Sequence, residues 1–260
     1  MKPTFYAFVF GAALLGLGCS SSTDGTQTAQ NPPPKTSEPA ATTTTGTADN
    51  TPDTDNDSGP SADSIPANFK NDAYHYYGLS RTEPINYVIS QAGIETTGTG
   101  AESVKFAGMD KNGKARFSIV RTGQLAQLPN QDVWLDDKAI TVASASPGTL
   151  DGHPIELPAK LSPGVTWKTD YKMSLSSGTY EDHSTYRVTG PAKVKTKAGT
   201  FDAILIESTG DDVENNVKVK VTTKAWYVKD RGAVRTVISS TAPNSKSQTI
   251  TFEAVPDPSK

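Results

Sequence analysis

The chain of 260 residues carries 25 basic and 28 acidic residues and is 35% hydrophobic, below the usual share for a globular protein. Seven of the acids lie between Ser20 and Ile65 against one base, Lys35. With Lys2 also set aside, 21 acids and 23 bases remain from Pro66 onward. A body so close to neutral argues against nucleic-acid binding. The only cysteine is Cys19, so an intramolecular disulfide is excluded.

The N-terminus has the features of an export signal. Met1 and Lys2 give a positive start, and residues 5–17 form an uncharged apolar run that is too short to span a bilayer. The run ends at Gly18-Cys19 and three serines follow, which resembles a bacterial lipoprotein signal. The resemblance implies removal of residues 1–18 and lipidation of Cys19, although Gly16 stands where the family prefers an aliphatic residue. Ordinary secretion with an incidental cysteine is the alternative.

A lipidated Cys19 would set the location of the protein. Two or three acyl chains, such as palmitate, hold a protein on a membrane more firmly than one chain does. By resemblance to enteric lipoproteins, Ser20 implies the outer membrane if the cell has two membranes. We therefore expect a protein of the cell envelope.

The segment from residue 19 to residue 65 is rich in Thr, Pro and Asp and has almost no large apolar side chains. It cannot bury enough surface to offset the entropy of ordering, so we expect a disordered linker. Alternating aspartates at Asp53, Asp55 and Asp57 are typical of the start of a calcium loop, but Ser58 and Ser64 occupy the positions that require Gly and Glu. An acidic spacer is favoured over a weak calcium contact.

Residues 66–260 predict a single all-β domain. Short segments alternate apolar and polar residues, and turn signals separate them. Asn112-Gly113 predicts one hairpin, and the turn at Asp230-Arg231-Gly232 predicts another. Without crossover helices, ten to twelve strands are expected to form an antiparallel meander, either a curved half-barrel or a sandwich. One short helix is expected within residues 67–77.

A family resemblance covers about residues 157–238. An aliphatic-Pro-Gly-x-x-Trp motif ends at Trp167, a Thr-x-Ala-Gly-Thr-Phe turn ends at Phe201, and a late hairpin contains Trp226 and Val234. This order of motifs is similar to uncharacterised bacterial lipoproteins and secreted β-domains whose half-barrels resemble periplasmic lipoprotein carriers. The resemblance implies a fold and a concave apolar binding face, and it implies no activity.

Catalytic and metal-binding patterns are weak. His75, His153 and His183 share no ligand spacing, so no metal site or cofactor is predicted. His183 is adjacent to Ser184, but neighbours in a strand point to opposite faces, which argues against a catalytic relay. The acidic stretch of residues 210–216 is read as a hairpin loop, with cation binding as the alternative. We predict a protein that is not an enzyme, and a hydrolase is the less favoured reading.

Lysines alternate with apolar residues in two segments. Each set lies on one face of its strand, opposite the valines or threonines. A solvated face is the simplest interpretation, and a basic stripe that meets anionic headgroups or a wall polymer is the alternative. The members of the possible stripe are Lys193, Lys195, Lys197, Lys218 and Lys220.

These observations predict a membrane-anchored, non-enzymatic lipoprotein of the envelope. Its partners would be the membrane, through Cys19, and either an apolar ligand or an envelope protein at the β domain. The alternative is a structural or surface-display lipoprotein without a small ligand. Trp134, Trp167 and Trp226 are expected to anchor the core, with Trp226 either covered on both faces of its strand or lining a groove.

Overall fold

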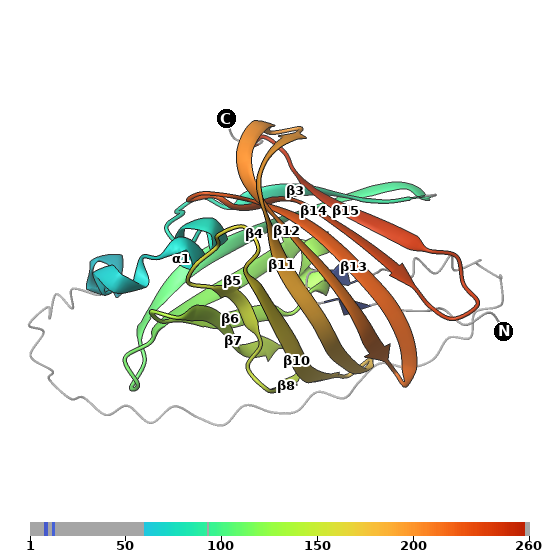
Figure 1. Cartoon of the computed structure of the whole chain (residues 1–260), viewed down its shortest axis with the longest axis horizontal. Coiled ribbons are helices and arrows are strands. Elements are labelled where there is room, and N and C mark those ends of the chain that lie inside the picture. The colour runs from blue at the N-terminus through green and yellow to red at the C-terminus, as the bar shows by residue number, and fades with distance from the viewer. Residues whose placement is uncertain (1–7, 10–11, 14–59, 93, 258–260) are drawn as a thin grey trace, which may run out of the picture. The chain divides into compact units, whose positions relative to one another are not determined.

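The computed structural model describes residues 8–9, 12–13, 60–92 and 94–257 (Figure 1). Strands β1 (Phe8–Val9) and β2 (Ala12–Ala13) pair with each other. The helices of the main body are η1 (Ala62–Ser64), η2 (Ala67–Phe69), α1 (Asp72–Tyr77) and η3 (Gln124–Gln127). Its strands are β3 (Ile85–Gln91), β4 (Ile94–Met109), β5 (Ala115–Gly123), β6 (Asn130–Leu135), β7 (Ala139–Ser146), β8 (Thr149–Asp151), β9 (Ile155–Pro158), β10 (Thr166–Leu175), β11 (Gly178–Thr196), β12 (Gly199–Glu214), β13 (Val217–Val228), β14 (Gly232–Thr241) and β15 (Gln248–Ala254).

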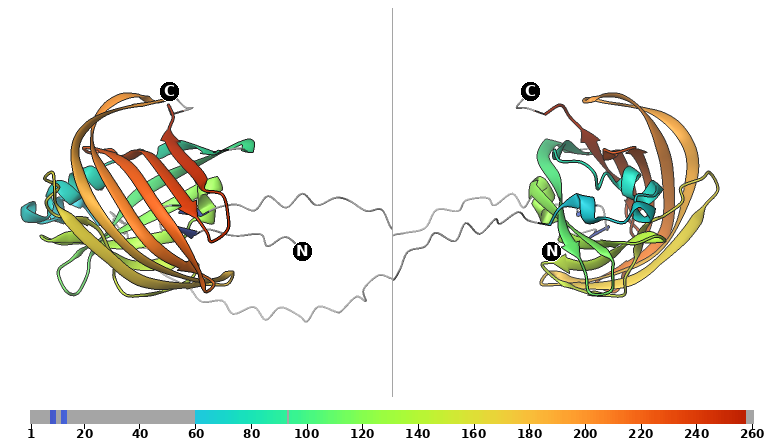
Figure 2. Two further views of the ribbon diagram at one scale, coloured as in Figure 1. Left: turned by 45° about the vertical axis from the view of Figure 1, so that its right-hand side comes forward. Right: turned by 90° about the vertical axis from the view of Figure 1, so that its left-hand side faces the viewer.

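The body is built on one antiparallel sheet of 13 strands in the order β8-β10-β11-β12-β13-β14-β15-β3-β4-β5-β6-β7-β9. The sheet is open and curved, and α1 lies on its concave side (Figure 2). This confirms the predicted all-β antiparallel fold and corresponds to the half-barrel rather than the sandwich. The edge strands β8 and β9 are separated by only three residues along the chain. The indole Nε1 of Trp167 in β10 also donates to the carbonyl of Ile155 in β9 at 3.1 Å, so the two edges lie close together.

Both predicted hairpin turns are confirmed. Between β4 and β5, the carboxylate of Asp110 accepts hydrogen bonds from the backbone N–H groups of Asn112 and Lys114, each at 2.8 Å. Gly113 has a φ of 77°, which glycine adopts at little cost. The Asp230–Gly232 turn joins β13 to β14. Local turn chemistry thus positions these connections, and register shifts between Phe106 and Gly108 and between Trp226 and Tyr227 set the pairing further along the strands.

The short helix expected within residues 67–77 is present as η2 and α1. Asn71 caps α1 by accepting from the backbone N–H of Tyr74 at 3.2 Å. Gly78 ends the helix in the left-handed region, and a Cβ there would lie 2.5 Å from the backbone carbon of Arg231. Glycine is therefore required both by its φ and by the close approach of the β13–β14 turn.

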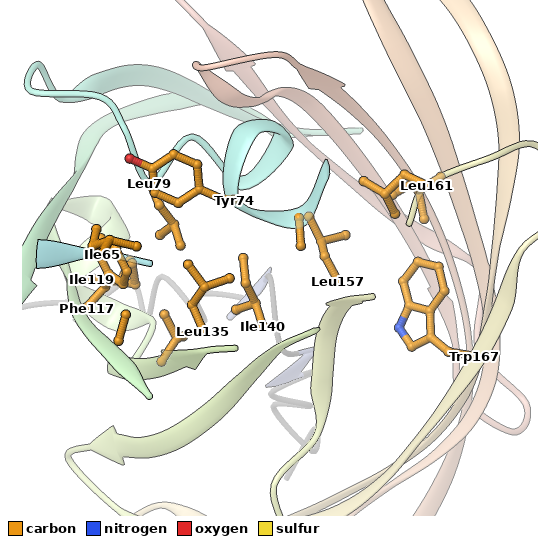
Figure 3. Close-up of a cluster of buried hydrophobic side chains, with 14 of the residues drawn as sticks. Ile65, Tyr74, Leu79, Phe117, Ile119, Leu135, Ile140, Leu157, Leu161 and Trp167 are labelled. Carbon is orange, nitrogen blue, oxygen red and sulfur yellow. The ribbon is translucent and has the colours of Figure 1, made fainter. Parts of the chain in front are cut away.

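The largest apolar cluster joins the helical segment to the sheet. Ile65, Tyr74 and Leu79 come from the helical segment and its flanks, and they pack with residues of the β5–β9 half of the sheet (Figure 3). Trp167 belongs to the same cluster, so this predicted core anchor is confirmed. Burial of such large side chains contributes about 1.5–3 kcal/mol each. This packing holds the C-terminal end of α1 beside the interior of the sheet.

The β11–β12 hairpin extends past the rest of the sheet. A bulge between Val188 and Gly190 redirects β11. Beyond it, Val194 belongs to an apolar cluster against which Phe201 and Trp226 pack. Trp226 and its neighbour Tyr227 face opposite sides of β13 and both are packed, so the strand is covered on both faces here.

Candidate functional site

A cavity of about 140 Å³ lies inside the curved sheet. Its wall includes residues from α1 and from most of the strands, and also Leu125 of η3. The volume is close to that of an engineered protein cavity that binds benzene. The apolar part of the wall includes Leu125, Leu128, Leu157, Ile206, Ile238 and Phe252.

Glu102, Arg121 and Arg81 form a charged triad beside the cavity, and Glu102 and Arg121 line its wall. Glu102 in β4 is paired across the strands with Arg121 in β5. It accepts from Arg121 Nε at 3.1 Å and from Arg81 Nη2 at 2.9 Å. Desolvation alone would raise the pKa of Glu102, but the charges and hydrogen bonds of Arg121 and Arg81 outweigh it and hold the pKa below its usual value. Glu102 is therefore a structural carboxylate that stays ionised.

Other groups accept from several of the remaining donors of the two arginines, while Arg81 Nε is buried without a hydrogen-bond partner among the described residues. Arg121 also donates to the carbonyl of Pro129 at 2.5 Å and to the side-chain oxygen of Gln131 at 3.0 Å. Arg81 donates to the carbonyl of Tyr77 at 3.0 Å and to that of Gly78 at 3.3 Å. The arginines thus tie α1, β4, β5 and β6 together rather than projecting into the cavity as free cations.

Glu156 in β9 is the second carboxyl group of the cavity wall. Burial raises its pKa to about 7, against the lowering effects of the Arg121 charge and a side-chain hydrogen bond from Gln131. The charges of Glu102 and Asp182 raise it further. Glu156 can therefore carry or release a proton close to neutral pH.

Four tyrosines also line the cavity. The hydroxyl of Tyr87 donates to the carbonyl of Ala233 at 2.6 Å. Among the described residues, the hydroxyls of Tyr77, Tyr186 and Tyr227 have no hydrogen-bond partner. Desolvation raises the pKa of each of these three, and the charge of Glu156 contributes to each shift. The three tyrosines therefore line the same cavity as Glu156, and its charge acts on each of them.

A separate buried polar cluster lies under β10–β12. Asp182 and Asp212 are 1% and 0% exposed. The hydroxyl of Tyr180 donates to Asp212 at 2.8 Å, and Asp182 bonds to the hydroxyl of Thr169 and to the backbone N–H of Ser184. Burial, and then the charge of Asp182, raise the pKa of Asp212 to about 7. The described residues contain no group of three or more His, Cys, Asp or Glu that is arranged to hold a metal ion.

The acidic stretch of residues 210–216 was predicted to be a loop, and this is wrong. Strand β12 continues to Glu214, and only Asn215 and Asn216 form the turn, with φ values of 47° and 68°. Two consecutive residues with positive φ make the tight turn that suits a hairpin. Asp212 therefore points into the body instead of solvent.

The register separates the two lysine sets. Lys193 pairs with Asp202, and Lys218 pairs with Val213, eleven positions further along β12. An odd separation places the two pairs on opposite faces, and at ~3.3 Å per residue they lie roughly 35 Å apart. The five lysines thus do not form one continuous stripe. Lys193 also forms a 2.7 Å ion pair with Asp202.

The other predicted residues have simple surroundings. His183 lies 3.2 Å from the carboxylate of Asp170 in the next strand, whereas Ser184 is buried against Asp182. Cys19 and the aspartates at 53, 55 and 57 lie outside the described residues. In the part of the chain that the structure describes, no helix is long and apolar enough to cross a membrane.

Comparison with known families identifies the chain. A family model described as "Protein of unknown function (DUF3108)" matches residues 111–253, more than half of the sequence. The chain belongs to the DUF3108 family. The DUF3108 match runs from the turn before β5 into β15, and it contains Arg121, Glu156, Tyr186 and Tyr227. Tyr77 precedes the match and comes from α1.

Two solved structures are similar in fold to this DUF3108 chain. One is a candidate lipoprotein from Parabacteroides distasonis, with 13% identity, a TM-score of 0.47, and coverage of 69% of this chain and 99% of that chain. The other is a candidate exported protein with YmcC-like fold from Bacteroides fragilis, with 12% identity, a TM-score of 0.47, and coverage of 67% and 95%. No curated protein matches the sequence. The resemblance stated for residues 157–238, to an uncharacterised bacterial β family, is confirmed and extends over a longer part of the chain.

The resemblance implied a concave apolar binding face, but the polar residues of the cavity were not predicted from the sequence. Counting back from the pairs next to the Asn112-Gly113 turn places Arg121 opposite Ser103, and only the register shift between Phe106 and Gly108 moves it opposite Glu102. Glu156 could not be assigned from the sequence either, because its neighbours in the cavity come from distant parts of the chain.

Proposed function

We propose that this protein is a non-enzymatic lipoprotein of the bacterial envelope whose β domain binds a small molecule with an apolar body inside the curved sheet. The cavity supports this binding role, because apolar side chains and a set of hydroxyl and carboxyl groups line the same space. Binding sites typically combine an apolar lining with a few convergent polar groups. Attachment through Cys19, in the outer membrane if the cell has two, rests on the N-terminal sequence.

Two adjacent threonines allow a matched test of the binding role. Thr223 lines the cavity, whereas Thr222, its neighbour in β13, is exposed. Thr223→Phe should fill the cavity, and Thr222→Phe adds the same side chain on the opposite face. Each variant is made in the full chain with Cys19→Ser, which removes the proposed anchor and keeps the protein soluble for measurement.

Native mass spectrometry then follows incubation with a small-molecule extract of bacterial envelopes. A bound mass of one small molecule is expected in the parent and in Thr222→Phe, and it should be lost in Thr223→Phe. A ligand-free parent would favour the structural lipoprotein instead. Equal capture by both phenylalanine variants would place any binding outside the cavity.

The anchor is tested separately. The wild-type chain should fractionate with membranes and incorporate labelled palmitate, and Cys19→Ser should abolish both. Membrane association that survives Cys19→Ser would contradict lipid attachment at this residue.

A further inference from the structure

The cavity wall contains hydroxyl groups whose hydrogen-bonding capacity the described residues do not use. Tyr77, Tyr186 and Tyr227 come from α1, β11 and β13, and among the described residues none bonds to their hydroxyls. Tyr87 shows the contrast, because its hydroxyl is satisfied by the carbonyl of Ala233. Hydroxyls inside a protein are normally hydrogen-bonded to protein or water, so three hydroxyls of partly buried tyrosines that line one cavity leave donors available to a ligand.

The two arginines beside the cavity, Arg81 and Arg121, already form hydrogen bonds with other groups of the protein. Glu102 bonds to both Arg81 and Arg121, and backbone carbonyls and Gln131 take most of their other donors. The two arginines and the ionised Glu102 therefore give the triad a net charge of plus one. Glu156 is the remaining carboxyl group that lines the cavity, and it lies within the influence of the Arg121 charge.

We propose that the cavity binds a monocarboxylic acid with a short apolar tail, its carboxyl group lying among the three tyrosine hydroxyls and the carboxyl group of Glu156. This inference rests on the proposed binding function and specifies its ligand class. The tyrosines donate hydrogen bonds to the ligand oxygens, while the tail packs against Leu125, Phe252 and the other apolar wall residues.

Charge balance favours an acid over other head groups. If the ligand carboxyl and Glu156 share one proton, the pair carries a single negative charge, which balances the net positive charge of the triad. An ammonium head group would leave the site with a net positive charge, and a phosphate dianion would leave it negative. An alcohol keeps the balance when Glu156 is ionised, but it offers the three hydroxyls only one oxygen.

The tail length follows from the cavity volume. About 140 Å³ is close to the space that holds benzene in an engineered cavity, so a tail of about five or six carbon atoms is expected. Hexanoate is therefore a suitable probe, and 1-hexanol and hexylammonium differ from it only in the head group.

Proton sharing gives the binding a defined pH dependence. The groups that interact electrostatically or by a hydrogen bond with Glu156 come from β4, β5, β6, β11, β13 and α1, and they are Arg121, Gln131, Glu102, Asp182, Tyr77, Tyr186 and Tyr227. Between about pH 5.5, where hexanoate is ionised, and about pH 7, Glu156 already holds the shared proton, so the affinity for hexanoate should be constant. Above this pH a proton must be taken up on binding, and the dissociation constant should rise about tenfold per pH unit.

The test measures dissociation constants for the three probes by ligand-observed NMR, using the Cys19→Ser chain and its Glu156→Gln variant. At pH 6.5 hexanoate should bind at least about tenfold more tightly than hexylammonium, and more tightly than hexanol. Glu156→Gln keeps a hydrogen-bonding group without needing a proton, so hexanoate binding should persist at pH 8.5 and lose its pH dependence. Tyr227→Phe should weaken hexanoate more than hexanol.

Three outcomes would overturn the inference. The first is equal affinity for hexanoate, 1-hexanol and hexylammonium. The second is that hexylammonium binds more tightly than hexanoate and that this binding is lost in Glu156→Gln. The third is that the affinity of the parent chain for hexanoate does not change with pH. Each of them leaves the proposed binding function standing if the envelope extract supplies a ligand that Thr223→Phe excludes. Failure of that extract experiment would instead remove the binding function itself.

Discussion

At the scale of single residues, the interior of the sheet contains two kinds of carboxyl group. Glu102 is held ionised by two arginines, whereas burial dominates at Glu156 and Asp212 and raises the pKa of each to about 7. The first kind stabilises the fold, and the second destabilises it once the group is ionised. Substitutions at the two kinds should therefore have opposite effects.

Glu102→Gln should be strongly destabilising. It leaves Arg81 and Arg121 buried without their carboxylate, and breaking a buried ion pair costs about 3–5 kcal/mol. For a body of this size, each kcal/mol lowers the melting temperature by about 2–4 °C. Lys193→Met is the matched control, because it removes an exposed ion pair worth at most about 1 kcal/mol. Thermal unfolding followed by circular dichroism compares them, and equal losses would contradict a structural role for the triad.

Asp212→Asn should stabilise the protein at alkaline pH. Because the folded-state pKa is raised to about 7, stability falls as the pH rises from about 4 to 7 and stays low above that range. Asparagine still accepts from Tyr180 but carries no charge, so the melting temperature at pH 8 should rise by about 2–4 °C or more, with little change at pH 4. Calorimetry at the two pH values checks this. If Asp212→Asn instead lowered the melting temperature at pH 8, the ionised Asp212 carboxylate would be stabilised by its surroundings, which would contradict the prediction.

At the scale of elements, the β11–β12 hairpin shows why alternation within strands could not predict whether the two lysine sets share a face of the sheet. Alternation correctly placed lysines and valines on opposite faces of each strand. The bulge between Val188 and Gly190, and the long offset along β12, then moved the two lysine sets to opposite faces and ends. A bulge of one residue reverses every side chain that follows it, and its position cannot be read from alternation.

Phe201→Ala should loosen the end of this hairpin. The guanidinium of Arg231 lies 4.8 Å from the Phe201 ring centre, and the backbone N–H of Ala198 donates to the carbonyl of Ala254 at 3.0 Å. Without the ring, amide exchange in residues 193–200 should accelerate about tenfold or more, because a partly buried aromatic contact contributes at least about 1 kcal/mol. Exchange measured by mass spectrometry tests this. The exposed neighbour Thr200→Ala should leave the rate unchanged.

At the scale of the whole molecule, much of the fold could be predicted because hairpin signals are local. The Asn112-Gly113 and Asp230–Gly232 turns each specify a connection within a few residues. The cavity could not be predicted in the same way, because Tyr77, Glu156 and Tyr227 converge only when the sheet curves. Curvature depends on bulges and on packing around α1, which act over the full length of the domain.

The central claim is that the interior of the curved sheet is a ligand site with a polar end at Glu156 and an apolar wall. A crystal structure of the Cys19→Ser chain with hexanoate tests it most directly. We expect the ligand inside the cavity, with its carboxyl oxygens within ~3 Å of Glu156 and of at least one hydroxyl of Tyr77, Tyr186 or Tyr227. A cavity filled only by water, with hexanoate bound to the outer lysines instead, would contradict it.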